Sequence, residues 1–94
     1  MSIARARGTL IAILMLSCAA AHSADPQAGK ALSQAQCSQC HDADDWVGES
    51  AASLESLIRD IVAGKVKHKT AVRLSDAQIA DVAAYWAQAS AKQR

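Results

Sequence analysis

The first 23 residues have the order of a leader that is removed, which shortens the part of the chain left to fold. Arg5 and Arg7 precede a short apolar run, and small residues follow it up to Ala21-His22-Ser23. A positive start, a short apolar middle and a small-residue exit are typical of a secretory signal peptide. We therefore predict a signal peptide over residues 1–23 and one domain over residues 24–94.

Two other uses of this leader are less consistent with its sequence. A membrane anchor needs about 20 apolar residues to cross the hydrocarbon core, and the candidate stretch covers only residues 9–21. Lipid attachment at Cys18 would need a suitable preceding signal, and Met15-Leu16-Ser17 is a poor one. We expect no stable membrane span after cleavage.

The remaining domain has little material for a core. The chain contains two Trp, one Tyr and no Phe, and aromatic side chains normally supply much of the buried area. Domains this small often add a metal or a disulfide to their core. The ten Lys and Arg nearly balance nine Asp and Glu, whereas a nucleic-acid-binding domain usually has a strong basic excess.

Two segments of the domain begin or end with clear helix signals. Asp25 and Pro26 predict a helix over residues 26–36, with Asp as the N-cap and Pro at the first position. Apolar residues then recur at helical spacing from Ala52 onward, and this second helix is expected to end at Gly64.

A third helix completes the expected fold. Ser75 and Gln78 have the spacing of a capping box and predict a helix through about residue 90. The acidic stretch of residues 42–50 and the basic stretch of residues 65–73 show no helical period, and we predict loops there. No segment alternates as a strand does, so the predicted fold class is all-α with three main helices.

The motif that indicates chemistry follows the first helix. Cys37-Ser38-Gln39-Cys40-His41 is C-x-x-C-H, the pattern of c-type haem attachment. Cys37 and Cys40 can form thioethers to the two vinyl groups of a haem, and His41 is then the proximal iron ligand. A covalent haem would also supply the apolar bulk that the domain lacks.

The motif has three alternative interpretations. A disulfide between Cys37 and Cys40 is possible in an oxidising compartment. A thioredoxin-like redox pair would lie in a βαβ pattern, which is absent from the sequence. A structural zinc site would need a fourth ligand such as His68, since no second cysteine pair exists.

The chain resembles a class I c-type cytochrome over nearly all of residues 24–94. The resemblance rests on Ala28-Gly29-Lys30-Ala31-Leu32, on the C-x-x-C-H motif, and on the run from Leu74 through Trp86. It implies a small cytochrome c-like fold with three main helices around one covalently attached haem c. It also implies that the first and last helices cross where Gly29 meets Tyr85 or Trp86.

The chain departs from that family at the sixth iron position. The usual Met is missing, because the only methionines are Met1 and Met15, and the chain contains no Asn. His68 lies about where the family's Met would fall, so we predict His41 and His68 as the two axial ligands. In the alternative, His68 is a solvated loop residue and the iron is five-coordinate, bound by water or ligated by a Lys. The usual proline after the haem histidine is also absent, although any backbone carbonyl could still accept from His41 and fix its tautomer.

We therefore expect an exported, periplasmic carrier of single electrons with a lowish potential, since a Met ligand would raise it. The alternatives are a five-coordinate haem protein that binds a diatomic gas and a thiol–disulfide protein. No catalytic constellation is visible, so an enzyme is not expected. Trp46 is a candidate for haem contact or for ordinary packing. Four basic residues suit docking to an acidic redox partner or simply form a solvated loop: Lys65, Lys67, Lys69 and Arg73. Four acidic residues are assigned to solubility: Asp42, Asp44, Asp45 and Glu49.

Overall fold

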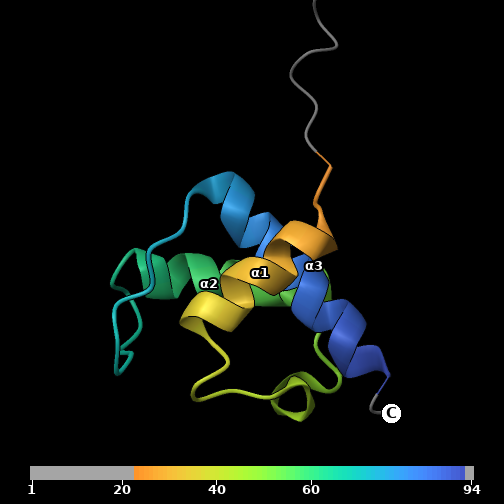
Figure 1. The fold of residues 1–94 in the computed structure, drawn as a ribbon. Coiled ribbons are helices and arrows are strands. Elements are labelled where there is room, and N and C mark those ends of the chain that lie inside the picture. The colour runs from red at the N-terminus through yellow and green to blue at the C-terminus, as the bar shows by residue number, and fades with distance from the viewer. Residues whose placement is uncertain (1–22, 93–94) are drawn as a thin grey trace, which may run out of the picture.

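The computed structural model describes residues 23–92, and this part of the chain is helical without any strand. Its elements are α1 (Pro26–Gln36), the short 3-10 helix η2 (Ala43–Trp46), α2 (Ala51–Val62) and α3 (Asp76–Ala91). Helix α1 lies across α3, and α2 packs against α3 as well (Figure 1). The predicted all-α fold with three main helices is confirmed. The signal peptide predicted for residues 1–23 lies, up to residue 22, outside the described residues.

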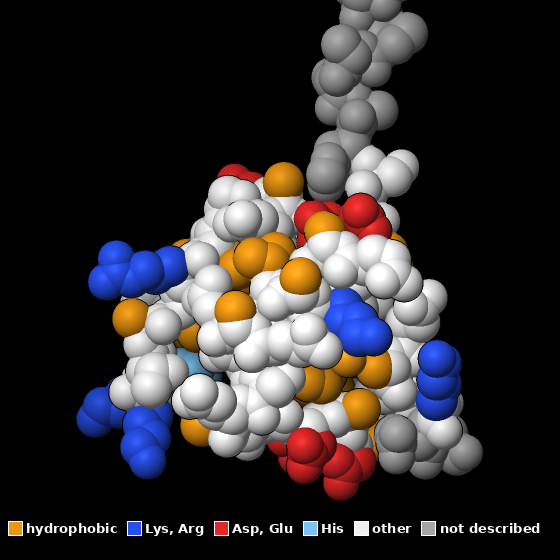
Figure 2. All heavy atoms as spheres, viewed as in Figure 1, with side chains coloured by type: hydrophobic (Ala, Val, Ile, Leu, Met, Phe, Trp, Pro, Cys, Tyr) orange, Lys and Arg blue, Asp and Glu red, His pale blue; other side chains and the backbone are white. Residues whose placement is uncertain are grey.

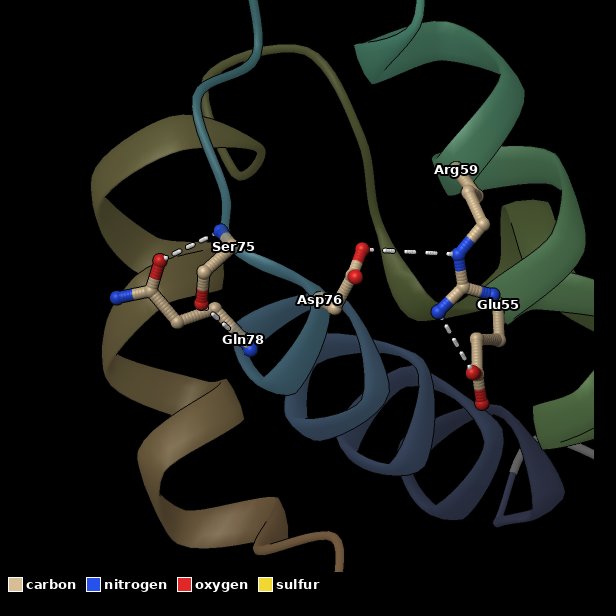
Figure 3. A network of polar contacts seen from close by, with 5 residues as sticks. All are labelled: Glu55, Arg59, Ser75, Asp76 and Gln78. Carbon is tan, nitrogen blue, oxygen red and sulfur yellow. Dashed lines mark hydrogen bonds and ion pairs between the residues drawn. The ribbon is translucent and has the colours of Figure 1, made fainter.

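Each long helix begins at the residue whose side chain caps it. Asp25 accepts a hydrogen bond from the Gln27 backbone at 3.0 Å, with Pro26 at the first position of α1. In front of α3, the Ser75 N–H donates to the Gln78 side chain at 2.9 Å and the Gln78 N–H donates to the Ser75 hydroxyl at 3.2 Å (Figure 3). These bonds satisfy N–H groups that a helix start leaves without partners, which is why the sequence located the starts correctly.

Helix α2 ends just before a glycine, and an arginine on α2 contacts the start of α3. Gly64 has φ +80, a left-handed conformation that glycine adopts without steric cost. Nη2 of Arg59 donates to Oε2 of Glu55 on its own helix at 3.1 Å, and Nε of Arg59 lies 3.8 Å from Oδ1 of Asp76 at the start of α3 (Figure 3). The contact between Arg59 and Asp76 is exposed and adds little stability. It shows that this part of α2 lies close to the start of α3.

The crossing of α1 and α3 depends on Gly29. A Cβ built on this buried glycine would lie 1.9 Å from the Asp81 carbonyl oxygen and 2.9 Å from the Val82 nitrogen. The expected close approach is confirmed, but the expected partner, Tyr85 or Trp86, is wrong. The helices cross one turn earlier on α3, so that backbone meets backbone rather than an aromatic ring.

The buried core is small and lies on α2 and α3. Its apolar members are less than a tenth exposed: Leu54, Ile79, Val82, Ala83 and Trp86. The described residues include no helix long and apolar enough to cross a membrane. The core leaves one side of α2 and α3 facing a cavity rather than protein, and the C-x-x-C-H motif lies at that cavity.

Candidate haem site

An open cavity of about 130 Å³ lies between α2, α3 and the two loops that flank them. Apolar side chains form most of its wall: Leu54, Leu57, Ile58 and Ile61 from α2, and Val82 and Trp86 from α3. The two predicted axial histidines also line it. A concave apolar site with few polar groups is the usual form of a cofactor pocket.

The end of α1 brings the two motif cysteines to this cavity. The chain makes one further turn after the helix, because the N–H groups of Cys40 and His41 both donate to the Cys37 carbonyl, at 3.1 and 3.0 Å. Cys37 is half-buried in the cavity wall and Cys40 is exposed beside it. Both thiols therefore lie on one turn, with His41 directly after them.

The environment of Cys37 is the opposite of that in a redox-active cysteine pair. Burial raises the pKa of the Cys37 thiol, and a hydrogen bond with the Trp86 side chain offsets this only in part. Thiol–disulfide catalysts instead lower the pKa of their nucleophilic cysteine to obtain a thiolate. Cys37 is thus placed to remain a neutral thiol and is unsuited to be the nucleophilic cysteine of such a pair.

His41 is oriented by a carboxylate. Its Nδ1 lies 3.1 Å from Oδ2 of Asp45, and the same oxygen accepts the Asp42 N–H at 3.0 Å. Hydrogen bonds from the Asp42 backbone and from the His41 ring hold the pKa of Asp45 below its usual range. An ionised carboxylate only accepts, so Nδ1 of His41 carries the proton and Nε2 is left as the ligand atom.

His68 lies in the loop after α2, with its ring near that of His41. Its Nδ1 lies 2.7 Å from the Thr70 carbonyl oxygen, which can only accept, so here too Nε2 is left as the ligand atom. The ring centroids of His41 and His68 are 6.3 Å apart, with 26° between the ring planes. Neither Nε2 makes a hydrogen bond to any residue of the described chain.

The separation of the two rings suits one metal ion between them. With metal–nitrogen bonds of about 2.0 Å, two imidazoles on opposite sides of an ion have centroids about 6 Å apart. In residues 23–92, no group of three or more His, Cys, Asp or Glu side chains is placed to hold a metal ion. A tetrahedral zinc site therefore does not fit, whereas a metal that a macrocycle holds in its plane needs only two axial ligands.

Trp46 connects this site to the core. Its ring centroid is 5.0 Å from that of His41 and 6.2 Å from that of Trp86. Its Nε1 is buried and has no hydrogen-bond partner within residues 23–92. A buried N–H without an acceptor is unfavourable, so this end of the cavity suits a ligand that carries an acceptor, such as a haem carboxylate.

Two functional residues were not singled out in the sequence analysis. From the sequence, Asp45 is assigned only to solubility and a backbone carbonyl is an acceptor open to His41, whereas in the structure η2 turns the Asp45 carboxylate toward the ring. The spacing of Asp42 and Asp45 is that of a capping box and was the available signal. Gln36 was missed as well: its side-chain amide donates to the Arg73 carbonyl at 3.1 Å and accepts the Arg73 N–H at 2.9 Å. This pair of bonds, the Gln36 clamp, fixes the loop that carries His68 to the end of α1.

Charge is separated around the cavity. Basic side chains gather at the left of Figure 2, over the loop after α2, and a histidine surface is visible among them. Lys67 and Lys69 line a second cavity together with Cys40 and the two histidines. Acidic side chains gather at the lower edge of the same view, on the side of η2 (Figure 2). The rim beside His68 is therefore basic.

Residues 24–85 match a protein-family model described as cytochrome c oxidase, cbb3-type, subunit III. The chain belongs to this family of c-type cytochromes. Its described part has the helical composition expected of a small cytochrome c fold. A comparison of this cytochrome with curated proteins and with solved structures gives no significant match.

The residues of the cytochrome fit the covalent haem c that membership of the family implies. Cys37 lines the apolar cavity, and Cys40 lines the second cavity, which shares Cys37 and both histidines with it. The buried Trp46 indole N–H has no acceptor within residues 23–92. The centroids of two imidazole rings lie 6.3 Å apart, a spacing suited to a shared ion. These features meet at one end of α1, where the sequence motif ends.

Proposed function

We propose that this cytochrome carries single electrons on one haem c, attached through Cys37 and Cys40 and ligated axially by His41 and His68. The observation that carries the proposal is the 6.3 Å separation of the two imidazole rings, each with its Nδ1 occupied by a hydrogen bond. When bound, the haem supplies the one-electron couple. The chain's own residues hold it, exclude water from one face and set the potential.

The cysteines suit attachment by addition. Each thiol adds its S–H across one vinyl double bond, so a thioether forms and no group leaves. A neutral thiol in an apolar wall is the form that Cys37 is placed to keep. Cys40 lies one turn further on and is exposed, so its thiol is accessible from solvent.

The second axial ligand sets the range of the potential. After residue 15 the chain has no methionine, and the histidine whose ring lies near that of His41 comes from the loop that precedes α3. A methionine ligand raises the potential of a c-type haem relative to histidine. We therefore propose a low-potential carrier rather than an enzyme or a gas-binding protein.

The site of action follows from the leader and from the rim of the cavity. The family match begins at residue 24, directly after the proposed signal peptide of residues 1–23, which supports export to the periplasm. The basic rim includes Lys67 and Lys69 beside His68. Complementary charge speeds the encounter of redox proteins, so the proposed partners present an acidic face to this rim.

Replacement of the distal histidine tests the proposal. His68→Ala, produced with haem attached, should lose the low-spin ferric spectrum of the wild type and bind carbon monoxide when reduced. Lys67→Ala is the matched control in the same loop and should keep the wild-type spectrum. A low-spin spectrum unchanged in His68→Ala would refute His68 as ligand, and reversible carbon monoxide binding by the wild type would favour a gas-binding protein.

A further inference from the structure

The orientation of the proximal histidine comes from a side chain rather than from the backbone. Nδ1 of His41 donates to Oδ2 of Asp45 at 3.1 Å. The sequence has no proline in the segment after the motif, because Pro26 is its only one. The carboxylate thus fills the place that a neutral backbone carbonyl could have taken, and a negative charge lies next to the ligand ring.

Hydrogen bonds within its own turn hold the Asp45 carboxylate in place. Oδ2 of Asp45 also accepts the Asp42 N–H at 3.0 Å, and the Asp45 N–H donates to the Asp42 carbonyl at 3.1 Å. These bonds close the turn of η2 and hold the carboxylate toward His41. The ring of Trp46, at 5.0 Å, limits the space on another side of the imidazole.

We propose that Asp45 is the positioning residue of the proximal ligand, and that its carboxylate lowers the reduction potential by making the His41 ring a stronger donor. The inference rests on the proposed role of His41 as an axial ligand. Hydrogen bonds to an ionised acceptor are about twice as strong as neutral ones, and a carboxylate acceptor raises the basicity of a ligating histidine. A more basic ligand and a nearby negative charge both favour the ferric over the ferrous state.

The size of the effect is limited by solvent. The side chains of His41 and Asp45 are 34% and 45% exposed, and water screens an exposed charge. Loss of a side chain that hydrogen-bonds to a metal ligand typically changes metal affinity or activity by 10- to 100-fold. The exposure of His41 and Asp45 favours an effect near the lower of these values. We therefore expect a shift of about tenfold in the one-electron redox equilibrium, which corresponds to 59 mV.

The test compares two substitutions that remove the same charge from the same turn. Asp45→Asn keeps an oxygen that can accept from His41 but loses the charge. The redox equilibrium should then shift about tenfold toward the ferrous state, which raises the potential by about 59 mV. Asp44→Asn removes the neighbouring charge and should shift the equilibrium less than about threefold, since Asp44 makes no hydrogen bond to the ring. Equal shifts in both variants, or no shift in Asp45→Asn, would overturn the proposal.

A second measurement does not depend on the stability of a variant. In the reduced, diamagnetic wild-type protein, the Nδ1 proton of His41 should exchange slowly with solvent and show a nuclear Overhauser effect to the Asp45 β-protons. Fast exchange, or contact with a different acceptor, would overturn the assignment of Asp45. A wild-type protein without covalent haem would instead overturn the proposed function, so the two failures are distinguishable.

Discussion

Replacement of Gly29 by alanine tests how the helix crossing positions the haem site. Helix propensity alone favours alanine over glycine by about 1 kcal/mol, so the substitution would stabilise an uncrowded helix. The crossing predicts the opposite sign. The added Cβ would lie 1.9 Å from the Asp81 carbonyl oxygen and 2.4 Å from the Asp81 carbonyl carbon, far inside the van der Waals contact distance.

The magnitude follows from what surrounds the added methyl group. Its three nearest neighbours are backbone atoms of α3, so a change of side-chain rotamer cannot relieve the overlap. Overpacking costs about 1–3 kcal/mol, and a contact this short belongs at the upper end. After the gain in propensity, we expect Gly29→Ala to lose about 2 kcal/mol of unfolding free energy, which is roughly 10 °C in Tm for a domain of this size.

The assay is guanidinium and thermal unfolding of the haem-loaded protein, followed by circular dichroism and by the Soret band. Ala31→Gly is the reciprocal control, because Ala31 is exposed on the same helix, and it should lose about 1 kcal/mol. If propensity governed both sites, the two substitutions would change stability in opposite directions. A Gly29→Ala protein as stable as the wild type, or more stable, would refute the close crossing.

Three further predictions concern the cavity and its rim. Gln36→Ala removes both bonds of the Gln36 clamp and should cost about 1–2 kcal/mol; by loosening the loop that carries His68 it should also allow the reduced protein to bind carbon monoxide, which neither the wild type nor the exposed Gln34→Ala should do. Trp46→Phe removes the buried N–H and keeps an aromatic ring; if Nε1 donates to a haem carboxylate, unfolding of the holoprotein should show a loss of about 1–2 kcal/mol, and an unchanged midpoint would count against that bond. Lys67→Glu should slow oxidation by anionic hexacyanoferrate(III) several-fold and weaken its salt dependence, and an equal effect of Lys30→Glu, which lies outside both cavities, would contradict docking at the rim.

The sequence predicted the helices well, because their starts are encoded locally. The first helix was expected over residues 26–36, and α1 spans Pro26–Gln36. The capping box at Ser75 opened α3 as expected. The second helix was expected to end at Gly64. In the structure α2 ends at Val62, Ala63 is its C-cap, and Gly64 follows directly after the cap. Caps and glycines act within a few residues of themselves, so their positions can be inferred without tertiary structure.

Contacts between distant segments were harder to predict. The crossing point of Gly29 on α3 depends on how two helix backbones pack, and the sequence does not encode the register of that contact locally. The bonds between Gln36 and Arg73 join positions 37 residues apart, and no local pattern indicates them. Asp45 was missed for a different reason: its carboxylate had the composition of a solvated loop, and only the turn of η2 shows that it points to His41.

The core is small because part of the apolar surface of α2 and α3 lines the cavity instead of packing against protein. The protein has few aromatic residues, and Trp46 and Trp86 line the cavity as well as packing in or against the core. A bound haem would bury the cavity-facing side of α2 and α3 and add apolar contact area that the chain does not provide. The haem is therefore expected to contribute to stability as well as to electron transfer.

The most direct test of the account is the low-temperature electron paramagnetic resonance of the ferric wild-type protein, combined with its near-infrared charge-transfer band. Together these signals identify the axial ligands of a c-type haem. The rings of His41 and His68, with centroids 6.3 Å apart, predict a single low-spin species with two imidazole ligands. A high-spin signal, or a band characteristic of water or lysine ligation, would contradict the central claim that His68 completes the iron site.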